Sequence, residues 1–227
     1  MASTNQLFIF GLFLTFTTIT VATTPAYLLT ESFLECRERS SVLLAPVMHC
    51  LSDQFSPDKV NETARLYSDT TACLYCKHVC RTREQIWECM RQGVESMKDF
   101  SNKSKTMIPS SVQLFKNIVN YFCDSEDEMF LGLTDEDMNC LKNSWDECKS
   151  NLDFIRNMDA VALCEFEDPD ATNLYTMEYV CKESNAYLDC SRDNVLRCHS
   201  RVYTAFLTLK AVLLIGAPCG KYDIEVR

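Results

Sequence analysis

Apolar residues recur along this chain at intervals of three and four, the spacing that gathers side chains on one face of a helix. The clearest stripe runs from Val112 through Phe115, Ile118 and Val119 to Phe122. Glycine is scarce, with five in 227 residues, so the tight turns typical of a barrel or sandwich are missing. The pattern therefore predicts an all-α fold, a bundle of several helices.

Capping residues and proline set the expected limits of the other helices. Ser32 and Glu35 form a possible capping box for the first helix, which Pro46 is expected to kink or restart. The polar segment from Ser101 to Pro109 is expected to be a loop. Further helices are predicted over 57–66, 73–80, 82–97, 134–148 and 170–180, and from Ser191 onward.

The helix that begins at Ser191 is expected to be the longest. Its second half, from Ala205 to Ile215, is apolar nearly all round and is interrupted mainly by Lys210. Because a helix that is apolar on every side is normally buried, we expect this half at the centre of the bundle. An alternative interpretation places it along the wall of a lipid cavity.

Fourteen cysteines, an even number, indicate up to seven disulfides in an oxidising compartment. Cys73, Cys76 and Cys80 share one face of a predicted helix, and Cys89 follows closely. Cys73 and Cys80 are about 10 Å apart in helical rise, beyond disulfide reach. We therefore expect that this face does not close on itself and that the helix is a hub, with at least some of its sulfurs bonded to other parts of the chain. The candidate disulfide residues are Cys36, Cys50, Cys73, Cys76, Cys80, Cys89, Cys123, Cys140, Cys148, Cys164, Cys181, Cys190, Cys198 and Cys219.

Two pairs of cysteines have the same spacing, because Cys140 and Cys148 are eight residues apart, as are Cys190 and Cys198. Eight helical residues rise about 12 Å, so neither pair closes within its own helix, although both keep their sulfurs near one face. If the two helices pack antiparallel, the spacing allows a two-rung ladder, Cys140 with Cys198 and Cys148 with Cys190. The alternative joins Cys140 or Cys148 to the hub helix, and spacing alone does not choose between them.

The amino-terminal segment has the pattern of a secretory signal peptide. No charged side chain precedes Glu31, and an apolar run from Leu7 to Val21 ends in small residues. We place the signal at residues 1–22 and expect 23–227 to form a single cysteine-rich extracellular domain. A retained membrane anchor is the alternative, although the run is short for a span of about twenty residues. The protein is thus expected to be secreted, with no membrane span after signal removal.

The net charge of −10 argues against partners that carry many phosphates. Such a surface repels phosphate backbones and anionic lipid heads, so we expect no nucleic-acid partner. The basic residues Lys77, Arg81 and Arg83 are followed by Glu84 and Glu88, and we interpret them as a solvated helix face. An ion-binding role for this cluster is the alternative.

The pair Cys73-Leu-Tyr-Cys76 has the spacing of a redox or zinc motif. No second pair completes four zinc ligands, and no strand–helix–strand pattern of a redox domain surrounds it. The three histidines, His49, His78 and His199, are too few for a histidine-based zinc hydrolase without a His-Glu-x-x-His sequence. A structural disulfide role is therefore favoured for both cysteines.

Two other segments match known sites only in part. Cys76-Lys-His78-Val-Cys80 resembles the cysteine-flanked histidine of secreted phospholipases A2, but the histidine is one position out of place and the glycine-rich calcium loop is absent. The segment from Asp135 begins like an EF-hand loop, but Cys140 stands where the sharp turn demands glycine. We therefore expect no enzyme activity, no catalytic or metal-binding residue and no cofactor.

A further set of residues follows a recognisable spacing from Cys36 onward: Val119-Asn-Tyr-Phe-Cys123, Asn139-Cys140-Leu141, Cys181, Cys190, Cys198 and Cys219. This spacing resembles that of the cysteine-rich, helical secreted proteins of arthropods, including the insect haemolymph glycoprotein family. It is more distantly similar to a nematode secreted domain. The resemblance implies an extracellular helical fold and no known catalytic residues.

These observations favour a secreted, disulfide-rich, non-enzymatic protein that acts by binding another extracellular protein or an apolar small molecule. An alternative is a secreted effector such as a venom or salivary toxin, because a stapled, protease-resistant scaffold suits both roles. A third interpretation, a calcium-dependent secreted lipase, has only the incomplete motifs described above in its favour.

Two sequons, Asn61-Glu-Thr63 and Asn102-Lys-Ser104, are candidate N-glycosylation sites in a secreted chain. We predict that Asn61 and Asn102 both carry glycans after passage through a eukaryotic secretory system. Peptide N-glycosidase treatment should remove the mass of two glycans from the wild-type protein, and of one from Asn61→Gln or Asn102→Gln. An unchanged wild-type mass after treatment would contradict the prediction.

Overall fold

The computed structural model describes residues 30–68, 71, 73–125, 132–156, 159–165, 174–216 and 218–222. The regular structure in these residues is helical, which confirms the all-α, disulfide-stapled prediction. The signal peptide predicted for residues 1–22 lies outside the described residues. The elements are α2 (Glu31–Gln54), α3 (Pro57–Tyr67), α4 (Leu74–Arg81), α5 (Arg83–Met97), α6 (Asn102–Asp124), α8 (Asp135–Cys148), η4 (Lys149–Leu152), α9 (Asp153–Arg156), η5 (Asp159–Leu163), α10 (Met177–Val195), α11 (Ser200–Ile215) and η6 (Cys219–Lys221).

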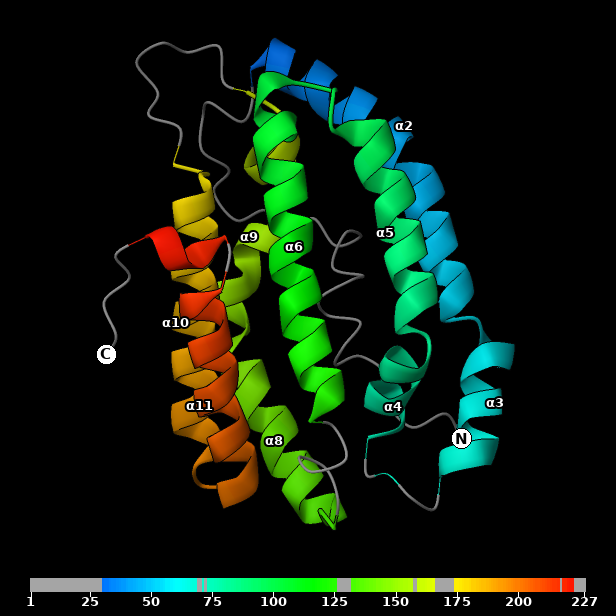
Figure 1. The fold of residues 1–227 in the computed structure, drawn as a ribbon, viewed down its shortest axis with the longest axis vertical. Helices are drawn as coiled ribbons and strands as arrows, with labels where there is room; N and C mark the ends of the chain where they lie inside the picture. The colour runs from blue at the N-terminus through cyan, green and yellow to red at the C-terminus, as the bar shows by residue number, and fades with distance from the viewer. Residues whose placement is uncertain are drawn as a thin grey trace.

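The long helices lie roughly side by side, with α6 in the middle (Figure 1). α6 packs against α5 on one side and against α11 on the other. Beyond α5 lies α2, with α3 and α4 at its lower end, whereas α10 and α8 pack together on the α11 side. α6 therefore separates an amino-terminal group of helices from a carboxy-terminal group and contacts both.

α2 is one continuous helix that contains Pro46, so the expected restart at this proline is wrong. The helix begins at Glu31, so Ser32 is already inside it and the expected capping box of Ser32 and Glu35 is wrong. Its N-cap is Thr30, whose hydroxyl accepts the backbone N–H of Phe33 at 3.4 Å. A proline removes one helical N–H and crowds the preceding turn. Tertiary support offsets that cost here, because α2 packs along α5 and carries a disulfide on each side of the proline.

The segment 101–109, predicted to be a polar loop, is instead the start of α6. Ser101 is the N-cap, and its hydroxyl accepts the N–H of Ser104 at 2.9 Å. The Ser104 hydroxyl accepts the N–H of Ser101 in return at 2.8 Å, which completes a capping box. Pro109 lies inside the helix. Two serines thus form a capping box at the start of a segment whose polar composition had indicated a loop.

The first turn of α6 is bonded to η5, which explains why its polar residues are buried. The Ser101 hydroxyl donates to the carbonyl of Leu163 at 2.5 Å, and the Lys103 N–H donates to the Glu165 carboxylate at 2.8 Å. The buried Lys103 ammonium donates to the carbonyl of Ala160. Burial lowers the pKa of Lys103 to about 8, and the negative charge of Glu165 opposes this shift.

The single long helix predicted from Ser191 is wrong, because Ser191 lies near the end of α10 and the chain turns before α11. The last residue of α10 is Val195, and α11 has 16 residues, fewer than the 24 of α2. His199 is the N-cap of α11, and its imidazole accepts the N–H of Arg201 at 3.3 Å. No glycine or proline marks this turn, so the sequence pattern contained no signal for it.

All fourteen cysteines are paired, which confirms the expected seven disulfides. Six bonds join residues that are between 38 and 128 positions apart, and the seventh spans three. The pairs are Cys36–Cys164, Cys50–Cys89, Cys73–Cys76, Cys80–Cys123, Cys140–Cys198, Cys148–Cys190 and Cys181–Cys219.

The two-rung ladder predicted from matching spacing is present in the structure. Cys140 of α8 is bonded to Cys198, just beyond the end of α10, and Cys148 of α8 is bonded to Cys190 within α10. This order of pairing requires α8 and α10 to run antiparallel, as the prediction assumed. The ladder joins α8 to α10 and its following turn, because the helix expected to carry both partners ends at Val195.

Lys210, the charged residue in the apolar half of α11, is paired with an acidic side chain inside the bundle. The Lys210 side chain is 6% exposed, and its ammonium lies 2.5 Å from the Asp189 carboxylate of α10. Asp189 also accepts hydrogen bonds from Arg192 at 3.0 Å and from Asn185 at 3.3 Å. This arrangement lets α11 pack closely on α10 without an unbalanced buried charge.

We predict that Asp189→Asn destabilises the protein by about 3 kcal/mol, because it leaves the buried Lys210 ammonium without its paired carboxylate. Lys210→Met is the matched control and should cost less, since it removes the buried charge while Asp189 keeps Arg192. Urea unfolding followed by circular dichroism, with the disulfides intact, measures both changes in the free energy of unfolding. Equal costs for the two variants would contradict the expectation.

Candidate functional site

The predicted hub segment contains α4, but its sulfurs are distributed differently from the prediction. Cys73 precedes α4 as its N-cap and bonds to Cys76, so one pair closes locally. Only Cys80 joins α4 to another helix, through Cys123 at the end of α6. Cys89 belongs to α5 and reaches α2. The expectation that at least some of these sulfurs bond to other parts of the chain is confirmed by Cys80–Cys123, whereas the expectation that this face does not close on itself is wrong for Cys73 and Cys76.

The local pair forms because Cys73 is not in the helix. The predicted geometry placed Cys73 on a helical face, whereas its φ of −121° and ψ of 86° place it outside the helical region. In this conformation its Sγ accepts the N–H of Cys76 at 3.3 Å, and the two Cα atoms are 5.2 Å apart. A sulfur thus caps α4, and Thr71 Oγ1 accepts the Cys73 N–H at 3.2 Å.

His78 of α4 is fully buried and connects its helix to α3 and to the end of α2. One ring nitrogen, Nε2, lies 2.8 Å from the carbonyl of Gln54 at the end of α2. The other, Nδ1, lies 2.7 Å from the Thr63 hydroxyl of α3. A carbonyl only accepts, so Nε2 carries the proton and a neutral ring accepts from Thr63 at Nδ1. Phe55 packs its ring against the imidazole with centroids 5.4 Å apart.

The role of His78 is structural, since both ring nitrogens are engaged within the fold. Burial lowers the pKa of His78 below its usual value, against the hydrogen bond to Gln54, which favours the charged form. The neighbouring charges of Arg81 and Lys59 lower the pKa further, and that of Glu62 raises it. Because these bonds occupy both ring nitrogens, His78 has no free imidazole nitrogen, although the sequence around it resembles that of secreted phospholipases A2.

The two sequon asparagines are exposed, whereas their hydroxyl partners are buried. Asn61 faces outward from α3, and Asn102 is the first residue of α6. Thr63 bonds to His78, and Ser104 belongs to the α6 capping box. A glycan on either asparagine would project into solvent, and its presence remains a prediction.

The acidic run that begins like an EF-hand loop forms the first turn of α8. The carboxylate of Asp137 accepts the N–H of Thr134 at 2.8 Å, and Thr134 Oγ1 accepts the N–H of Asp137 at 3.2 Å. The pair is a capping box, and these bonds lower the pKa of Asp137. Across the described ranges, no group of three or more histidine, cysteine or acidic side chains lies where it could hold a metal ion.

Two hollows on the described residues are open to solvent and lined mostly by polar residues. One, of about 410 Å³, lies along α8 beside the Cys140–Cys198 bond and includes Glu136, Asn143 and Arg197. The other, of about 290 Å³, lies at the end of α2 and includes His49 and Asp53.

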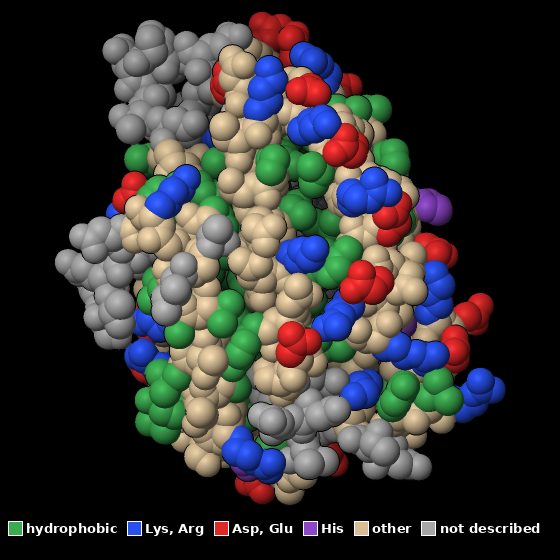
Figure 2. Space-filling model, viewed as in Figure 1, with side chains coloured by type: hydrophobic (Ala, Val, Ile, Leu, Met, Phe, Trp, Pro, Cys, Tyr) green, Lys and Arg blue, Asp and Glu red, His purple; other side chains and the backbone are tan. Residues whose placement is uncertain are grey.

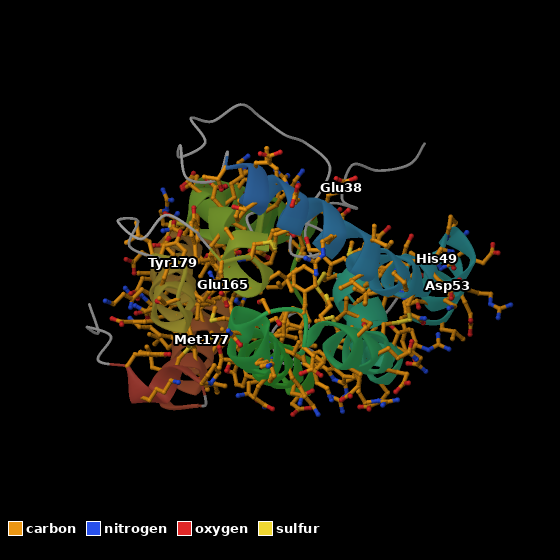
Figure 3. The ribbon with its side chains drawn as sticks, turned by 90° about the horizontal axis from the view of Figure 1, so that it is seen from above. Glu38, His49, Asp53, Glu165, Met177 and Tyr179 are labelled. Carbon is orange, nitrogen blue, oxygen red and sulfur yellow. A yellow bond between two sulfur atoms is a disulfide. The ribbon has the colours of Figure 1, made fainter. Side chains whose placement is uncertain are left out.

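His49 and Asp53 point away from the bundle, on the opposite side from Glu165, Met177 and Tyr179 (Figure 3). Asp53 is paired with Lys59 at 2.7 Å, which lowers the pKa of the carboxyl. Neither this hollow nor the one along α8 includes a residue of α11.

α11 lies at the surface, so the expectation of a central, fully buried half-helix is wrong. Its inner face is buried, but Thr204, Thr208 and Ala211 are exposed, and Leu207 is 42% exposed. The Thr204 and Thr208 hydroxyls donate to carbonyls one turn back in the same helix, at 3.1 and 3.3 Å. Their methyl groups therefore contribute to a surface that offers little hydrogen bonding. We call these four side chains the α11 outer face.

Charge is distributed unevenly between α11 and the other helices. From Val202 to Ile215 the only charged residue is Lys210, which is buried and paired with Asp189. Figure 2 shows uncharged and hydrophobic side chains over α11, whereas charged side chains are dense over α2 and α5. The sequence pattern did not predict this exposed face. The apolar pattern of the helix indicated burial on all sides, and the threonines were not recognised as part of an exposed surface.

No helix in the described ranges has the length and apolar character needed to cross a membrane. No protein-family model, curated protein or solved structure matches this chain.

We predict that stability decreases as the pH falls below about 6.5, the usual histidine pKa, because of His78. The folded state holds this ring neutral, so below that pH the unfolded chain binds the proton more readily and gains stability. Above it both states are neutral and the contribution is constant. Chemical unfolding between pH 7.5 and 5.5 measures the effect, with His78→Gln as the control for other titrating groups. Identical slopes in the two proteins would rule out His78 as the source.

Proposed function

We propose that this chain is a secreted, non-enzymatic extracellular protein that binds another protein through the α11 outer face. The uncharged, exposed character of Leu207 and its neighbours is the observation that carries the proposal. Contiguous exposed apolar surface marks interaction sites more often than it occurs by chance on a soluble protein. Seven disulfides fit an extracellular compartment, and the cysteine-spacing resemblance to arthropod secreted proteins agrees with that setting.

The chemistry of this face defines the kind of partner. A charged group placed against Thr204, Leu207, Thr208 or Ala211 would lose water and gain no counter-charge from them. The partner surface is therefore also apolar and uncharged, which is the composition of the buried centre of a protein interface. A protein partner suits the described surface better than an apolar small molecule, because the two hollows described above are open to solvent and do not enclose a ligand.

A matched pair of variants tests the proposed face. Leu207→Glu places a charge in the α11 outer face, whereas Val42→Glu places one on α2, where Val42 is 69% exposed beside the charged residues Glu38 and Arg39. We predict that the full-length protein forms a complex with a protein from the extracellular fluid of its source. Leu207→Glu should weaken this complex at least about tenfold, and Val42→Glu should leave it intact.

Native mass spectrometry of the purified complexes measures partner mass and occupancy for each variant, and circular dichroism confirms that each is folded. Equal binding by wild-type protein and Leu207→Glu would refute this face as the binding site. A spectrum with only a retained apolar small molecule would favour ligand carriage instead, and the absence of any partner would refute the binding role.

A further inference from the structure

The Cys73–Cys76 disulfide differs from the other six in what it connects. The other bonds close loops of at least 38 residues and join separate elements, whereas this one spans three positions at the start of α4. The restriction that a disulfide places on the unfolded chain grows with the loop it closes, so this bond contributes least to stability by that mechanism. α4 is anchored independently by Cys80–Cys123.

The two sulfurs of this bond lie in unequal surroundings. Cys73 is partly exposed, whereas Cys76 is 2% exposed and packs in the hydrophobic core. Cys73 Sγ already accepts the N–H of Cys76 in the first turn of α4. A thiolate at Cys73 would keep this donor and would lie at the positive end of the helix, with Lys77 one turn further along.

We propose that Cys73–Cys76 is a thiol-exchange site that accepts two electrons from a dithiol of an extracellular protein. The inference rests on the spacing, exposure and helix position of the pair, and it does not depend on the proposed binding role of α11. It assigns to this Cys-x-x-Cys pair a chemical function, in place of the purely structural role favoured by the sequence analysis.

The exchange proceeds in two balanced steps. A thiolate of the partner attacks the accessible Cys73 Sγ, forms a mixed disulfide and displaces the Cys76 thiolate, which takes up a proton. The second thiolate of the partner then attacks its own sulfur in the mixed disulfide and displaces the Cys73 thiolate, which the Cys76 N–H stabilises. The partner ends as a disulfide, and Cys73 and Cys76 end as two thiols that carry the partner's two protons.

Graded reduction of the full-length protein tests the lability of the bond. The protein is equilibrated with increasing dithiothreitol as the dithiol probe, alkylated and mapped by mass spectrometry. Cys73 and Cys76 should be alkylated at a dithiothreitol concentration at least about tenfold below that needed for any other pair, while the helical circular dichroism is unchanged. Earlier alkylation of another pair, or simultaneous opening of all pairs, would overturn the proposal.

Paired serine variants separate exchange from structural support. The double variant Cys73→Ser/Cys76→Ser should fold, keep six disulfides and lose consumption of dithiothreitol at low concentration. Cys50→Ser/Cys89→Ser also removes one bond, but that bond closes a loop of 39 residues, so this control should lower the melting temperature and keep the labile exchange. Failure of the first variant to fold, or a loss of melting temperature equal to that of the control, would show that the bond is structural.

Single variants test the predicted inequality of the two sulfurs. In Cys76→Ser the remaining Cys73 thiol should form a mixed disulfide with oxidised glutathione. In Cys73→Ser the buried Cys76 thiol should react at least about tenfold more slowly. Equal rates of adduct formation, measured by intact mass, would contradict the assignment of Cys73 as the attacked sulfur.

Discussion

A single disulfide, Cys36–Cys164, cross-links the first part of this bundle to the last. It closes a separation of 128 residues, and each of the other six disulfides lies wholly before Ser125 or wholly after Gly132. In the chain-entropy account, closing a loop of this length restricts the unfolded chain by about 5 kcal/mol. The bond also fixes α2 beside η5, to which the first turn of α6 is bonded, so the position of the central helix depends on it.

Polar and charged groups complete the packing between the helices that the disulfides bring together. His78 connects α3 and α4 to the end of α2, and Lys210 bonds α11 to Asp189 of α10. These two buried side chains each meet a partner from another element, which avoids the desolvation cost of an unpaired polar atom. Such contacts in the interior specify which helices meet. The α11 outer face and α4 lie on opposite sides of α6, so the two proposed activities use separate surfaces (Figure 1).

Local periodicity predicted the fold class and the disulfide ladder, but not the features that depend on a single residue's conformation. The ladder of Cys140 and Cys148 followed from spacing, because helical rise excludes bonds within one helix. The local bond between Cys73 and Cys76 was not predicted, because it requires Cys73 to be non-helical. The exposure of α11 was not predicted for a different reason. Threonine methyl groups can face solvent when their hydroxyls bond within the helix.

The arrangement of cross-links has a consequence for proteolysis. A break at any peptide bond between Cys123 and Cys140 divides the chain into two pieces, and each piece retains three internal disulfides. Cys36–Cys164 holds the pieces together, so the cleaved protein stays one covalent molecule until that bond is reduced. Cleavage in the middle of the chain can thus create new ends without separating the α11 outer face from the amino-terminal helices.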